Sequence, residues 1–140
     1  MTSNKGISAW ALLPVRLTIG LMFMVHGSGK LFGWFGGGGL KGVAQMTQSL
    51  GMNPPMLWAI LLAGSEFFGG AFLFIGLLTR WATIPLIITM FVALFRVHLS
   101  KGFFLPGGFE YVWVILGGLF AVLIGGAGSG SLDQCRCKKP

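Results

Sequence analysis

Four apolar runs, each long enough to form a membrane-spanning helix, set the pattern of hydrophobic and polar positions in this chain. We expect helices at about residues 8–33, 56–78, 81–99 and 110–127, because a helix needs about 20 apolar residues to cross a bilayer. The runs are apolar on every side, whereas the strands of a membrane barrel alternate apolar and polar residues. The pattern therefore predicts an all-α membrane protein, built as a bundle of four transmembrane helices.

The segment between the first two apolar runs has a different pattern. Residues 27–39 are rich in glycine and aromatic residues, which suit the membrane–water interface, and they lack the GxxxxGK[ST] spacing of a phosphate-binding loop. Apolar residues then recur at helical spacing, at Leu40, Val43, Met46 and Leu50. We therefore expect a short amphipathic helix at about residues 40–51, lying at the interface.

The composition narrows the class of protein further. Of the 140 residues, 54% are hydrophobic and 9% are charged, compared with about 25% charged residues in an ordinary soluble domain. This length fits one domain, residues 1–140, with a tail at 128–140. The net charge of +7 comes from basic residues spread along the chain or grouped in the tail. This distribution suits orientation in a lipid bilayer, and we expect no nucleic-acid partner.

The basic residues also predict an orientation. Four spans would place five basic residues on the same side as both termini, and four on the other side. This excess favours cytoplasmic termini. Lys5 and the apolar stretch after it resemble a secretory signal peptide, but Arg16 interrupts the stretch and no A-x-A-like site follows. We therefore expect the first helix to be retained.

Two charged residues lie inside the predicted spans, Arg16 in the first and Glu66 near the middle of the second. An uncompensated charge at the centre of a membrane helix costs about 2.5–3.5 kcal/mol on insertion scales. Because the two helices are predicted to be antiparallel neighbours, we expect Arg16 and Glu66 to interact, directly or through water. Such a pair would either hold the two helices together or take part in ligand binding or proton transfer, and the sequence leaves both roles open.

Other ionisable residues gather near the same predicted face of the membrane. His26 and Lys30 lie on the same side of the first helix as Arg16. Arg96 and His98 are two residues apart and point in nearly opposite directions, so we expect His98 to face the bundle interior and Arg96 to face head groups or a loop.

Glu110 begins the fourth predicted helix on that face. Its carboxylate could reach His98, Lys101 or Lys30, or it could simply match the dipole at the start of its helix. A metal or haem site is not expected, because the sequence contains no HxxxH or ExxH spacing. No Ser-His-Asp arrangement is visible either.

The tail contains a C-x-C motif at Cys135 and Cys137. In the cytosol these thiols would stay reduced unless they are catalytic, and the basic residues around them would favour the thiolate form. A redox role and an incidental or lipid-modified tail are both compatible with this motif.

Several short motifs make the chain resemble the DoxX family of bacterial membrane proteins over about residues 12–133. The tail C-x-C motif is not part of this pattern. The matching residues, in order, are Arg16, Gly20, His26-Gly27, Lys30-Leu31-Phe32, Leu50-Gly51, Pro54 or Pro55, Glu66-Phe67, Gly69-Gly70, Gly76-Leu77, Thr79-Arg80, His98, Gly102-Phe103-Phe104, Glu110-Tyr111 and Ser131-Leu132-Asp133.

The resemblance implies a four-helix protein of the bacterial inner membrane with links to redox chemistry. Relatives include the DoxD subunit of a thiosulfate:quinone oxidoreductase and members associated with quinone or thiol stress and superoxide-detoxifying partners. Quinone binding requires hydrogen-bond donors at the carbonyls and a proton route. We therefore expect an oxidoreductase subunit with a quinone-binding site and with Glu66 and His26 as catalytic residues. The residues expected to bind the quinone are Arg16, His26, Lys30, Glu66, His98 and Glu110.

No motif binds a redox centre of the chain's own, so we expect no covalently bound cofactor and expect electrons to come from a partner subunit or a substrate. A homo-oligomer is also compatible with the sequence. Two other functions stay open. One is a structural or accessory subunit whose glycine-rich faces dock other helices. The other is a small transporter, supported by the similarity between residues 26–37 and 98–108, each with a His, a Ser, a Lys, aromatic residues and Gly-Gly.

Overall fold

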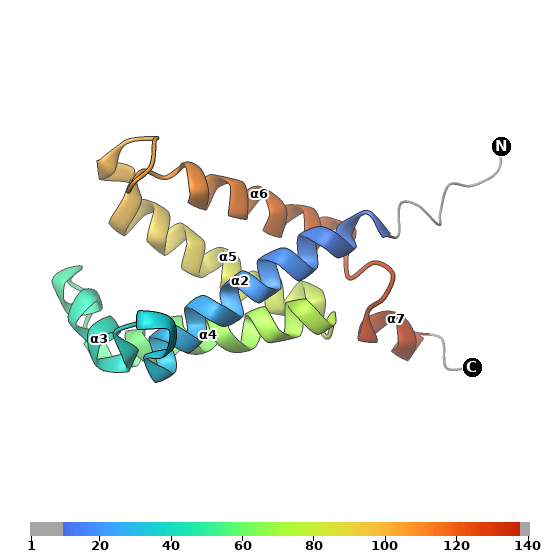
Figure 1. Ribbon diagram of the computed structural model, residues 1–140, viewed down its shortest axis with the longest axis horizontal. Helices are drawn as coiled ribbons and strands as arrows, with labels where there is room; N and C mark the ends of the chain where they lie inside the picture. Colours follow the sequence, from blue (N-terminus) through green and yellow to red (C-terminus); the bar gives the residue numbers. More distant parts are fainter. Residues whose placement is uncertain (1–9, 138–140) are drawn as a thin grey trace.

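The computed structural model describes residues 10–137, and in this part of the chain every regular element is helical. Four longer helices form a ring in which α2 contacts α4, α4 contacts α5, α5 contacts α6 and α6 contacts α2. Figure 1 shows them with the shorter α3 at one end and α7 at the other. The helices are α2 (Leu12–Phe32), α3 (Gly39–Ser49), α4 (Pro55–Ile75), α5 (Thr79–Ala93), α6 (Glu110–Gly125) and α7 (Leu132–Cys137).

Short helical turns extend two of these elements. The turn η1 (Trp34–Gly36) follows α2. A π-helical turn, η2 (Leu94–His98), and a 3₁₀ turn, η3 (Leu99–Lys101), continue α5. With these turns, α5 forms one apolar segment of 23 residues from Thr79 to Lys101.

The all-helical prediction is confirmed, and three of the predicted spans are long and apolar enough to cross a membrane. These three are α2, α4 and the segment Thr79–Lys101. The fourth apolar helix, α6, has 16 residues. At a rise of about 1.5 Å per residue it is roughly 24 Å long, shorter than a hydrocarbon core of about 30 Å.

Helices α2 and α4 pack closely through glycine. A Cβ atom on Gly20 would lie 2.7 Å from the backbone nitrogen of Phe74, and one on Gly27 would lie 2.6 Å from the Cα of Phe67. Small residues let membrane helices approach each other in this way. The two contacts also fix the antiparallel register, because they place residue 27 level with residue 67 and residue 20 level with residue 74.

The amphipathic helix predicted at residues 40–51 is present as α3, but its apolar face packs on protein. Val43 and Thr47 are buried, and the Thr47 hydroxyl donates to the carbonyl of Pro55 at the start of α4 at 3.0 Å. The α3 helix therefore covers the part of α4 that extends beyond the end of α2.

The core of the ring lies mainly between α5, α6 and α2, where Phe23, Leu86, Leu119 and Val122 are almost fully buried. Large apolar side chains also cover the outer surface of the ring, including Val114 and Ile124, which are 72% and 76% exposed. An apolar outer surface of this kind is expected of helices that face lipid.

Candidate functional site

The predicted pair between Arg16 and Glu66 is wrong, because the two residues lie at opposite ends of the bundle. In the register of α2 and α4, Glu66 is level with Ser28, twelve residues along α2 from Arg16. Twelve helical residues span about 18 Å, far beyond the reach of a salt bridge. Each residue is nevertheless buried, with Arg16 1% and Glu66 2% exposed.

Arg16 instead holds the segment that follows α6. Its guanidinium donates to the carbonyl of Ala127 at 2.5 Å and to that of Gly130 at 2.8 Å. Asp133, in the first turn of α7, accepts hydrogen bonds from the backbone nitrogens of Leu78 and Thr79 at 2.8 and 2.9 Å. Arg16 and Asp133 therefore join α2, the start of α5 and the segment after α6 at one end of the molecule, the end that carries α7 in Figure 1.

Glu66 pairs with Lys30 at the other end of the bundle. The Lys30 Nζ atom lies 2.5 Å from Oε1 of Glu66, and the Lys30 side chain is 32% exposed whereas that of Glu66 is 3% exposed. The other oxygen, Oε2, is buried and has no hydrogen-bond partner. A buried carboxylate oxygen without a partner is costly, so this atom is a natural place for a ligand or a water molecule to bind.

A cavity of about 150 Å³ lies beside this ion pair, between α2, α4, the end of α5 and the start of α6. Its polar lining consists of His26, Lys30, Glu66, His98 and Tyr111. The rest of its lining is apolar and is formed by Met22, Phe23, Met90, Ala93, Val112 and Ile115. An apolar cavity with a few converging polar groups is the usual form of a small-molecule site.

The π-helical turn η2 places His98 in this cavity. Met90 and Ala93 line the cavity from α5, and in a continuous α-helix the next residue on that face would be Val97. A π turn advances the repeat from four residues to five, so His98 occupies that position instead. His98 therefore faces inward, as predicted. Arg96 faces away and donates to the carbonyl of Leu50 at 3.4 Å.

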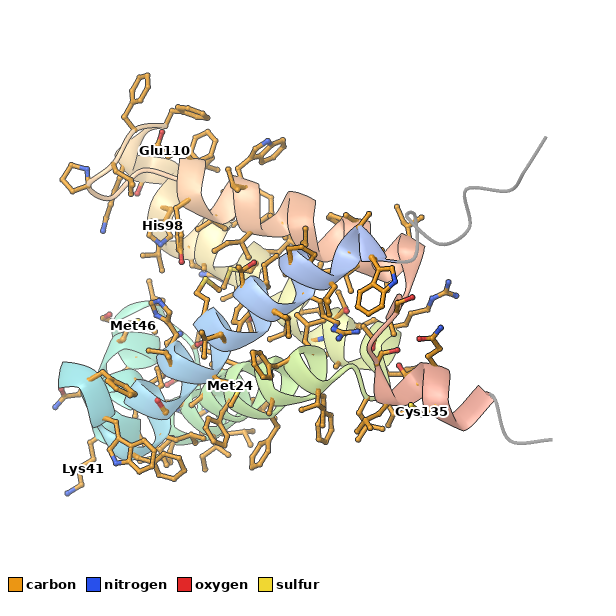
Figure 2. All side chains as sticks on the ribbon, turned by 45° about the vertical axis from the view of Figure 1, so that its right-hand side comes forward. Met24, Lys41, Met46, His98, Glu110 and Cys135 are labelled. Atoms are coloured by element: carbon orange, nitrogen blue, oxygen red, sulfur yellow. The ribbon has the colours of Figure 1, made fainter. Side chains whose placement is uncertain are left out.

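One nitrogen of His98 is already engaged. Its Nδ1 atom lies 2.7 Å from the carbonyl oxygen of Gly107. A carbonyl only accepts hydrogen bonds, so Nδ1 carries a proton, and in the neutral ring Nε2 is left as an acceptor. Figure 2 shows His98 at the end of the bundle that also holds Glu110, opposite the end with Cys135.

Two residues expected at the site lie outside the cavity. Arg16 is at the opposite end of the bundle, as described above. Glu110 accepts a hydrogen bond from the backbone nitrogen of Leu105 at 3.0 Å and so orders the loop before α6. Cys135 is exposed on α7, at the end remote from the cavity. Within the described part of the chain, no group of three or more His, Cys, Asp or Glu side chains is placed to hold a metal ion.

Sequence reasoning did not identify two features of the site. Tyr111 lines the cavity, and its hydroxyl contacts the Sδ atom of Met22 at 2.7 Å, which links α6 to α2. Its place beside Glu110, as the single tyrosine of an apolar chain, was an available signal. Lys30 was predicted to share a face with His26, but its pairing with Glu66 depends on the register between α2 and α4, which the sequence pattern does not show.

Comparison with known proteins supports the family resemblance. Residues 11–99 match the model of the DoxX family. A protein of Bacillus subtilis (strain 168) named "Putative oxidoreductase CatD" is 30% identical over 112 residues, which cover 80% of this chain and 77% of the relative. No solved structure gives a significant match. The family match spans well over half of the sequence and includes Lys30, Glu66 and His98, and the chain therefore belongs to the DoxX family.

Proposed function

We propose that this DoxX-family chain binds a quinone or quinone-like ring in the cavity beside Glu66, as a subunit of a membrane redox or detoxification assembly. The observation that carries the proposal is that Glu66 lines the cavity and that its buried Oε2 atom has no hydrogen-bond partner. The oxidoreductase name of the Bacillus subtilis relative supports a redox role.

The size of the cavity suits one aromatic ring. An apolar cavity of about 150 Å³ is known to bind benzene, and the cavity beside Glu66 has about the same volume. A longer tail on the ring would have to lie outside the cavity, among lipid chains or along the outer surface of the helices.

The polar groups suit a ring with oxygen atoms on opposite sides. Lys30 uses one of its donors on Glu66 and has two more for a carbonyl oxygen. His98 and Glu66 both line the cavity, and the Nε2 atom of His98 and the Oε2 atom of Glu66 could each accept a hydrogen bond from a hydroxyl group. These residues can therefore bind the oxidised or the reduced form of the ring, and Glu66 and His98 can take up or release its protons.

His26 lies beside Lys30 on the cavity wall and is proposed to relay protons. Histidine changes its charge near neutral pH, which suits this role. The two electrons of a quinone–quinol conversion would be exchanged with a partner redox subunit, because the groups named here hold only protons.

We further propose that the chain lies in the bacterial inner membrane with four spans and cytoplasmic termini. The supporting features are the apolar outer surface and the three helices long enough to span. The short α6 would cross at a locally thinned part of the bilayer. Residues 102–109 and α3 would then lie on the periplasmic side, with α3 at the interface. A reporter fused after residue 140 tests this orientation.

Quinone binding tests the proposed site. Purified protein in nanodiscs should bind a short-tailed ubiquinone or menaquinone analogue, measured by calorimetry, and Glu66→Gln should weaken binding. Ser65→Ala is the matched control, because Ser65 is next to Glu66 on α4 but lines a different, apolar cavity. Affinity that is absent in the wild type, or unchanged in both Glu66→Gln and His98→Ala, would remove the proposal.

A further inference from the structure

A second cavity, of about 300 Å³, lies outside the first and beside η1. Val25, His26, Gly29 and Lys30 of α2 form one wall, and the other wall comes from residues 34–37. We call this space the outer cavity, and the one beside Glu66 the inner cavity. The outer cavity lies next to the last turn of α2, where a membrane helix reaches the head groups.

The two cavities share part of their walls. His26 and Lys30 line both of them, whereas Glu66 lines only the inner cavity and Val25 only the outer one. The ion pair therefore joins a partly exposed side chain to a buried one. Its lysine side chain is 32% exposed and its carboxylate side chain is 3% exposed.

The wall formed by η1 is held in a demanding conformation. Phe35 has a φ of 54°, in the left-handed region that non-glycine residues rarely adopt, and its side chain is 78% exposed. Gly37 packs so closely on the backbone of Gly29 that there is no space for a side chain there. The wall therefore combines the exposed aromatic residues Trp34 and Phe35 with two glycines that add no side chain to the outer cavity.

Toward the centre of the bundle the inner cavity is closed. Phe23 lies on its wall and is 1% exposed, and Leu73 and Leu119 are fully buried in the adjoining layers. Beyond them Arg16 is engaged with backbone carbonyls at the opposite end. Water can therefore approach Glu66 through the outer cavity, but apolar packing separates Glu66 from the other end.

We infer that the outer cavity is a hydrated vestibule, through which water and protons reach the Lys30–Glu66 pair from one membrane face only. His26 and Lys30 form the boundary between the vestibule and the inner cavity. This inference requires the chain to span a membrane, and it does not depend on which molecule occupies the inner cavity. If a quinone does bind there, the vestibule determines the side of the membrane with which the site exchanges protons.

Cysteine labelling from each side of the membrane tests the inference. His26→Cys keeps the Lys30–Glu66 pair and is made in a background in which Cys135 and Cys137 are changed to serine. A membrane-impermeant, cationic methanethiosulfonate reagent reacts with thiols that water can reach. We expect it to label position 26 in vesicles of one orientation and to fail in the opposite orientation. Leu21→Cys, on the outer surface of α2, should resist the reagent from both sides.

A variant that fills the outer cavity shows whether the reagent reaches position 26 through that cavity. Val25→Trp places a large side chain in the outer cavity without touching the inner one. Adding it to His26→Cys should abolish or strongly slow the labelling, and quinone affinity measured on Val25→Trp alone should stay at the wild-type value. One-sided labelling of a protein that binds no quinone would support the vestibule and rule out the proposed ligand. Failure of the vestibule inference can therefore be distinguished from failure of the proposed quinone site.

Labelling from both sides, or from neither side, would overturn the inference, as would labelling that Val25→Trp leaves unchanged. If His26→Cys does not fold, Lys30→Cys provides the same measurement. Treatment of an unlabelled sample with 2-bromoethylamine alkylates the free thiol and converts that cysteine into a close analogue of lysine, so the Lys30→Cys protein should then regain the stability of the ion pair.

Discussion

Removing Lys30 should destabilise the protein more than neutralising Glu66, although the two residues form one ion pair. Lys30→Met leaves a carboxylate that is 3% exposed without its ion partner, and its Oε2 atom already has no hydrogen bond. Glu66→Gln keeps an oxygen that can accept from Lys30, and the remaining ammonium group can be hydrated because that side chain is one-third exposed.

The expected sizes follow from this asymmetry. Breaking a buried ion pair typically costs about 3–5 kcal/mol. The inner cavity has room for water beside the carboxylate, so we expect Lys30→Met to lower the free energy of unfolding by about 2–3 kcal/mol. Glu66→Gln should cost about 1 kcal/mol. The double variant should cost about the same as Glu66→Gln alone, which corresponds to a coupling energy of about 2–3 kcal/mol.

Unfolding by sodium dodecyl sulfate in mixed micelles, followed by tryptophan fluorescence, measures these free energies. Lys41→Met is the matched control, because Lys41 is exposed on α3 at the same end of the bundle. It should change the free energy of unfolding very little. The reasoning would be refuted if Glu66→Gln were as destabilising as Lys30→Met, or if the effects of the two substitutions were simply additive.

Three further substitutions test the remaining packing and polar contacts. Arg16→Met removes two charge-assisted hydrogen bonds, to the carbonyls of Ala127 and Gly130, and should cost about 3 kcal/mol in unfolding experiments without changing quinone affinity at the far end. Asp133→Ala removes the acceptor for two backbone nitrogens at the start of α5 and should cost about 1–2 kcal/mol, visible as faster hydrogen exchange there. Gly27→Ala would press a methyl group onto the backbone of Phe67 and should lower the free energy of unfolding. Gly64→Ala is the control, because Gly64 has open space around it and should tolerate the methyl group. Equal effects of the two substitutions would contradict the proposed packing.

Apolar runs and helix-ending residues predicted the helices well. The expected 56–78 and 110–127 appear as Pro55–Ile75 and Glu110–Gly125, because proline, glycine and the first polar residue after an apolar run mark helix ends regardless of tertiary contacts. The amphipathic pattern at 40–51 likewise predicted α3. Its burial against α4 was not predicted, because periodicity shows that one face is apolar but not whether lipid or protein covers that face.

The pairing of the buried charges could not be predicted in the same way. The cost of burying Arg16 and Glu66 indicates that each needs a partner, but it does not identify that partner. The partner depends on how far α4 slides along α2, and that is fixed by contacts of Gly20 and Gly27 with α4. The inward position of His98 was predicted from its opposition to Arg96, but the π turn that places it there is not revealed by apolar periodicity.

Each buried charge keeps one buried atom without a hydrogen-bond partner, Nε of Arg16 and Oε2 of Glu66, so it is their surroundings that separate their roles. Arg16 donates two hydrogen bonds to backbone carbonyls and lines none of the cavities described here. Glu66 keeps one oxygen without a partner, beside a cavity and next to a cation that solvent can reach. A cavity with a few converging polar groups is the usual form of a small-molecule site, and of the two only Glu66 lines such a cavity. Stability should therefore depend most on the Arg16 end of the bundle, and ligand chemistry on the Glu66 end.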